Sequence, residues 1–200
     1  MGDGGIRTPY GSYARVLHWL TVLLVIAAWI MARFGEQLFD TGIDALHAAT
    51  AIGLSIHLWI GVAVLIIAVL RFRWRIANPS PPPEVNEFSR WLIAWTDPSA
   101  RLMHYVLYIL LVGVPIIGIL LLFSEGKFLS VIGLADIAPS FRVTRDIAHS
   151  LRKLHIVLAN VLVIVAVFHA TTAILHYAVF RDSTLARMVP WLRKGDPKSP

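Results

Sequence analysis

The sequence predicts an all-α protein: an integral membrane four-helix bundle. The chain has 200 residues and is 57% hydrophobic, which exceeds the apolar content typical of soluble domains. Four apolar runs, at residues 16–32, 52–70, 102–123 and 154–180, are each about as long as a helix that crosses a bilayer. None shows the alternation expected of a membrane β-strand. We therefore expect residues 1–200 to form a single membrane domain with four spans.

The basic residues indicate how the chain is oriented. We call the side of the membrane on which the chain begins side A, and the opposite side B. Of the 18 Lys and Arg residues, twelve fall on side A and six on side B. Because basic residues accumulate in cytoplasmic loops, side A is predicted to be cytoplasmic, with both termini inside. This bias explains the net charge of +6, so no nucleic-acid partner is needed to account for it. The first run lacks a small-residue cleavage site and is expected to be a retained signal anchor.

The last apolar run contains His155 and His169. Fourteen helical positions advance about 1400°, close to four full turns, and rise about 21 Å, so both rings leave one helix face near opposite membrane surfaces. Polar residues are costly at membrane depth, which makes a histidine there a functional hypothesis. Two haems, one above the other, would need this arrangement.

Depth gives each of these histidines candidate partners on other helices. His57 lies fourteen residues before Arg71, which directly follows the second run, so His57 is near side B and can pair with His155. On side A, His169 can pair with His18 or with His104, and depth leaves both open. A zinc site is a poorer fit, because zinc would need three or four clustered ligands, whereas these pairs are separated by the membrane. The chain has no cysteine, which excludes iron–sulfur clusters and covalent haem attachment, so two histidine-ligated b-type haems are favoured.

Arginines and histidines at the span ends allow two interpretations. Arg15 and Arg71 lie where basic side chains commonly extend to the headgroups, but haem propionates lie at that level too, and we expect a propionate role for both. His104 and His176 are explained equally well by hydrogen bonds between helices.

The connections are expected to contain little regular structure. The proline-rich stretch 79–83 is predicted to be a stiff linker, and the side B connection 124–153 to include a short interfacial helix. His47 and His149 fall outside the apolar runs and are expected to lie in solvated loops. Pro115 is expected to kink the third span.

The chain resembles the bacterial cytochrome b561 family of four-helix di-haem membrane proteins. The resemblance is carried in family order by residues 13–20, 56–71, 104–118, 154–176 and 185–190. It implies two haem b groups, with His18 and His169 as axial ligands on the cytoplasmic side and His57 and His155 on the periplasmic side. It also implies a bacterial inner membrane protein that exchanges electrons with ubiquinone.

The predicted function is an oxidoreductase that passes electrons between a periplasmic donor and ubiquinone. Superoxide is the favoured donor, since Arg142, Arg145, Arg152 and Lys153 on side B could steer an anion toward the outer haem. His176 shares a helix face with His169, about 10.5 Å further along the axis, and is expected at the quinone site.

Three departures from the family leave the donor open: His47, an extended N-terminus with Gly2-Asp-Gly-Gly5, and a longer first periplasmic loop. One alternative is a cytochrome b subunit that accepts electrons from a periplasmic dehydrogenase or hydrogenase. The other is a non-redox transporter or structural membrane protein whose histidines only form hydrogen bonds.

Overall fold

Four long helices form most of the protein. The computed structural model describes residues 11–39, 44–78, 90–125, 129–131, 135–137, 144–179 and 184–192. The long helices are α1 (Ser12–Phe39), α2 (Asp44–Ala77), α3 (Arg90–Ser124) and α4 (Arg145–Ala178). Each contains a stretch long and apolar enough to cross a membrane. The predicted all-α bundle with four spans is therefore confirmed.

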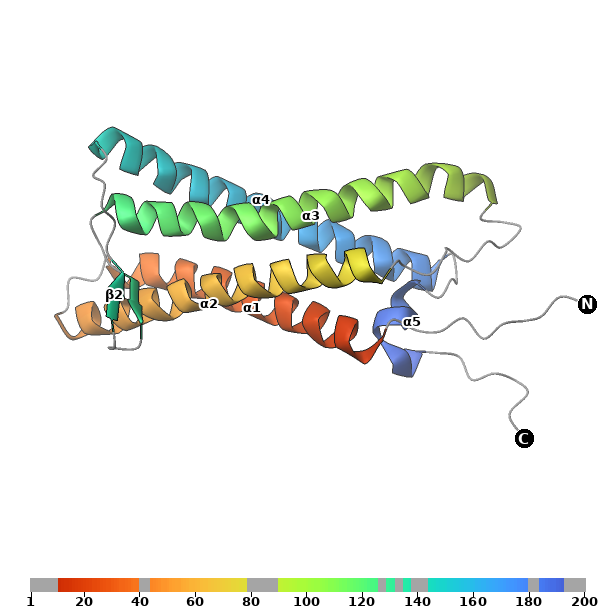
Figure 1. Cartoon of the computed structure of the whole chain (residues 1–200), viewed down its shortest axis with the longest axis horizontal. Helices are drawn as coiled ribbons and strands as arrows, with labels where there is room; N and C mark the ends of the chain where they lie inside the picture. Colours follow the sequence, from red (N-terminus) through yellow and green to blue (C-terminus); the bar gives the residue numbers. More distant parts are fainter. Residues whose placement is uncertain are drawn as a thin grey trace, which may run out of the picture.

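The helices are arranged as two antiparallel hairpins that lie side by side along their length (Figure 1). Helix α1 packs on α2, and α3 packs on α4, while α2 and α3 join the two hairpins. At side A, the short helices α5 (Thr184–Met188) and η2 (Pro190–Leu192) follow α4. The indole nitrogen of Trp19 donates a hydrogen bond to the carbonyl oxygen of Met188 over 3.2 Å. This bond fixes the C-terminal segment to the beginning of α1.

The helices extend beyond the apolar runs, which corrects two predictions. Helix α4 begins at Arg145 and α2 at Asp44, so His149 and His47 lie in helices and not in loops. Only residues 40–43 lie between the end of α1 and the beginning of α2. Segment 145–153 and the alanine-rich start of α2 contain strong helix formers, which continue each helix beyond its membrane-spanning run.

The side B connection contains strands where a short helix was predicted. Strands β1 (Leu129–Val131) and β2 (Ala135–Ile137) pair in antiparallel fashion, with Ser130 opposite Asp136. Val131 and Ile137 are β-branched residues, which favour strands over helices. Segment 79–83 lies outside the described residues. Helix α3 continues through Pro115 without a break.

The buried core lies halfway along the bundle. It consists of six residues from three helices: Val64, Ala68, Leu110, Leu111, Val114 and Leu162. Leu162 stands seven residues from both His155 and His169, so it lies about 10 Å along the helix axis from each histidine level. Large apolar side chains such as Leu23, Ile109 and Ile164 are exposed on the outer surface, as expected of helices that face lipid.

Candidate functional site

His57 of α2 and His155 of α4 face each other at side B. Their ring centroids are 6.1 Å apart, and their planes are nearly perpendicular at 86°. A metal–imidazole bond is about 2 Å long and the nitrogen lies roughly 1 Å from its ring centre, so imidazoles on opposite sides of one metal have centroids about 6 Å apart. The observed separation therefore suits two axial ligands of a single iron.

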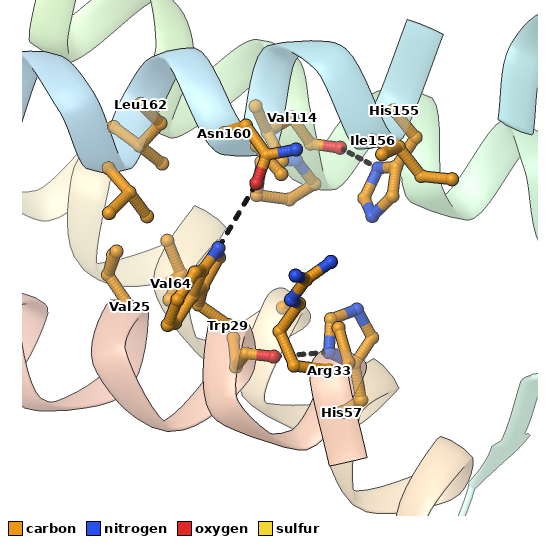
Figure 2. Close-up of a pocket in the computed structure, with 16 residues that line it drawn as sticks. Val25, Trp29, Arg33, His57, Val64, Val114, His155, Ile156, Asn160 and Leu162 are labelled. Atoms are coloured by element: carbon orange, nitrogen blue, oxygen red, sulfur yellow. Dashed lines mark hydrogen bonds between the residues drawn. The ribbon is translucent and has the colours of Figure 1, made fainter. Parts of the chain in front are cut away.

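A backbone carbonyl of the neighbouring helix orients each of these rings. Nδ1 of His57 donates to the carbonyl oxygen of Ala28 in α1 over 2.9 Å. Nδ1 of His155 donates to that of Val114 in α3 over 3.1 Å. Because a carbonyl can only accept, Nδ1 carries the proton and Nε2 keeps its lone pair. Figure 2 shows the second nitrogen of each ring pointing toward the other ring. Metal-bound histidines generally have such a carbonyl or carboxylate partner.

These two histidines line a pocket between the two hairpins, which we call the side B pocket. It is open to the surroundings and is lined mainly by apolar residues of α1, α2, α3 and α4. Its polar lining includes Trp29, Arg33 and Asn160. Sites that hold cofactors commonly have this apolar character, with few polar groups.

The indole of Trp29 bridges the side B pocket. Its nitrogen donates to the side-chain oxygen of Asn160 over 3.2 Å, which links α1 to α4 (Figure 2). The guanidinium of Arg33 lies 6.0 Å from the centre of the Trp29 ring. The sequence analysis missed all three residues. An asparagine five residues after His155, at membrane depth, was the signal that could have identified Asn160.

Three histidines gather at side A. The ring centroids of His18 and His169 are 6.5 Å apart, whereas those of His104 and His169 are 5.1 Å apart. The first separation is close to the roughly 6 Å expected across one metal, and the second is too short. The geometry thus favours His18 over His104 as the partner of His169. Nδ1 of His104 donates instead to the carbonyl of Ala100 in its own helix.

Arg71 of α2 lies at the same level. Its Nη2 donates to Nδ1 of His18 over 3.2 Å, and its guanidinium lies 5.7 Å from the centre of the Tyr108 ring. A guanidinium can only donate, so Nδ1 of His18 must accept and Nε2 must carry the proton. Ligation of a metal through Nε2 requires the other tautomer, and Arg71 would then have to bond another acceptor.

The remaining predicted site residues are spread along side A. Arg15 lies in the first turn of α1, before His18. His176 lies in the last turn of α4, half-buried, and seven residues from His169. Among the described residues, no group of three or more His, Cys, Asp or Glu side chains could hold a metal ion. Opposed pairs of imidazoles suit haem, whose macrocycle supplies the other four ligands.

Known proteins give an independent view of the chain. The family described as prokaryotic cytochrome b561 matches residues 9–191. The probable superoxide oxidase CybB of Yersinia pestis is 32% identical over 178 residues, which cover 87% of this chain and 92% of that protein. Cytochrome b561 homolog 1 of Escherichia coli (strain K12) is 30% identical over 178 residues, covering 87% of this chain and 93% of the relative. The chain therefore belongs to the prokaryotic cytochrome b561 family, which makes it a membrane electron-transfer protein that uses b-type haem.

Proposed function

We propose that the protein binds two b-type haems and transfers electrons between a periplasmic donor and ubiquinone. His57 and His155 would hold the haem at side B, and His18 and His169 the haem at side A. The observation that carries this proposal is the opposed imidazole pair at each level, with centroids 6.1 Å and 6.5 Å apart. In both pairs, one ring comes from the α1–α2 hairpin and the other from α4.

Each haem, when bound, supplies a group that accepts and releases one electron. The protein's own residues orient the ligands and exclude water. At side B, the carbonyl groups of Ala28 and Val114 accept the Nδ1 protons, which fixes the rings and increases the basicity of Nε2. Between the levels, Val64, Ala68 and Leu162 form part of a buried apolar core. At side A, Arg71 and Arg15 would pair with haem propionates.

The orientation follows from the charge bias. Side A, with twelve of the 18 basic residues, would face the cytoplasm of a bacterium, and the protein would lie in the inner membrane with both termini inside. Side B would then face the periplasm. The haem held by His57 and His155 would be the one nearest to a periplasmic donor.

Superoxide is the donor that we favour, and a similar protein is named a probable superoxide oxidase. Two superoxide anions would each lose one electron and leave as dioxygen. One ubiquinone would take up the two electrons with two protons and leave as ubiquinol. Arg145 and Lys153 at the beginning of α4 would attract the anion. Arg152 forms an ion pair with Glu125, so its charge contributes less than the sequence suggested.

The quinone would bind at side A, near His176. A histidine side chain can donate a hydrogen bond to a quinone oxygen. His176 lies about 10.5 Å beyond His169 along the helix axis, and would therefore lie at headgroup level. Ubiquinone could enter at this level from the membrane.

Stopped-flow spectroscopy of the purified protein tests the proposal. Superoxide should reduce the haems within the mixing experiment, and added ubiquinone should reoxidise them. If superoxide leaves the haems oxidised but a co-purifying dehydrogenase reduces them, the donor is that protein and not superoxide. A protein without a haem absorption band after expression with ample haem would contradict the proposal entirely.

A further inference from the structure

Gly118 of α3 leaves the space that the imidazole of His155 occupies. A Cβ atom at this position would lie 2.9 Å from Cε1 and 3.3 Å from Nδ1 of His155. Real side chains essentially never approach a Cβ within 3.0 Å. Among the described glycines, Gly53, Gly61 and Gly113 would meet nothing within 4 Å. Gly118 therefore differs from these glycines in its contact with a proposed iron ligand.

The surroundings leave His155 little room to move away. Its Nδ1 is bonded to the carbonyl oxygen of Val114 over 3.1 Å, and Val114 lies one helical turn before Gly118. One face of α3 thus supplies both the acceptor for the ring and the gap beside it. If a side chain filled the gap, the imidazole would have to leave Val114 or turn Nε2 away from His57.

We infer that Gly118 is a positioning residue of the side B site: the missing side chain lets His155 lie against α3 with Nε2 directed at the iron position. The inference rests on the proposed function, because it treats His155 as an axial ligand. Neither the spacing of the histidines nor the four apolar runs identifies Gly118, since its role depends on the contact between α3 and α4.

Gly118→Ala tests the inference, and Gly113→Ala is the matched control on the same helix. Alanine forms helices better than glycine, so helix propensity alone would make both variants slightly more stable. The haem-to-protein ratio should fall from two toward one in Gly118→Ala and stay at two in Gly113→Ala. His155→Ala, measured in parallel, should also give a ratio near one.

A second readout reports ligand orientation. The EPR spectrum of a ferric haem with two imidazole ligands depends on the angle between their planes, which is 86° at side B and 61° at side A. In Gly118→Ala, any side B haem that remains should give a shifted signal, while the side A signal stays in place. A ratio and both signals identical to those of Gly113→Ala would overturn the inference.

Double substitution separates a clash with the ring from a general defect of α3. Gly118→Ala should lower the thermal unfolding midpoint when His155 is present, and should not lower it in the His155→Ala background. The inference would be overturned if Gly118→Ala lowered the unfolding midpoint equally with and without His155, or if neither the single nor the double variant assembled. If His155→Ala keeps two haems, the proposed ligand assignment itself fails, which is a different result from a silent Gly118→Ala.

Discussion

Arg71 donates a hydrogen bond to Nδ1 of His18, so the two helices of the first hairpin are joined at the level of the side A site. The same ring faces His169 across the bundle. Because an axial ligand needs its proton on Nδ1, His18 cannot accept from Arg71 while Nε2 binds iron. We expect Arg71 to exchange His18 for a haem propionate, which is a charged and stronger acceptor.

Arg71→Gln should weaken haem binding at side A and spare side B. Residues that support a metal ligand typically contribute about 10- to 100-fold to affinity, and we expect a loss of at least about tenfold. Titration of the haem-free protein with haem would measure it. Arg73→Gln removes the same charge two residues along α2 and should behave as the unaltered protein. Equal affinities in both variants would contradict the role of Arg71.

Removal of single histidines should separate the two sites. His57→Ala or His155→Ala should lose the side B haem, and His18→Ala or His169→Ala the side A haem, each lowering the haem-to-protein ratio from two to about one. His104→Ala should keep both haems. The rings of His104 and His169 are only 5.1 Å apart, which is too close for an iron to lie between them. Pyridine haemochrome assays of purified variants would give the ratios. Loss of a haem in His104→Ala, but not in His18→Ala, would reassign the side A pair.

The hydrogen bond between Trp29 and Asn160 should stabilise the contact between α1 and α4. A hydrogen bond of this kind contributes about 1 kcal/mol, so Trp29→Phe and Asn160→Leu should each lower the thermal unfolding midpoint. Because both changes remove the same bond, their combination should cost less than the sum of the two. Strictly additive effects would show that the bond contributes nothing to stability.

His176→Ala should slow the reoxidation of the haems by ubiquinone about tenfold, the equivalent of one lost hydrogen bond of about 1.4 kcal/mol. Both haem spectra and the rate of reduction from side B should remain unchanged. His149→Ala is the control, since His149 lies in the same helix but at the opposite end and exposed. Unaltered reoxidation in His176→Ala would place the quinone elsewhere.

The sequence predicted the depth of residues in the membrane better than which residues of different helices face one another. Run length and hydropathy were enough for the four spans, and residue spacing was enough to place His155 and His169 at two levels. Depth alone could not choose between His18 and His104, because both lie near side A. The choice depends on how the hairpins pack, which appears only in the 6.5 Å and 5.1 Å separations.

The sequence also could not predict the hydrogen bonds that backbone atoms accept from the histidines. Nothing in the apolar pattern identifies the carbonyl groups of Ala28 and Val114 as partners of His57 and His155. These bonds depend on helix contacts that position neighbouring backbones within 3.1 Å of a ring nitrogen. The helix ends were missed for another reason: hydropathy marks the membrane-buried portion, whereas hydrogen bonding continues α4 back to Arg145.

The presence of one ligand of each proposed pair on α4 has a consequence for biogenesis. As the ribosome delivers the spans in order, His18 and His57 enter the membrane early, but neither meets its partner until the last long helix is inserted. A nascent chain with only three spans would lack His155 and His169, so each proposed pair would have only one of its two ligands. Tight haem capture would then coincide with the completion of the bundle, so that partly inserted chains would not acquire redox-active cofactors.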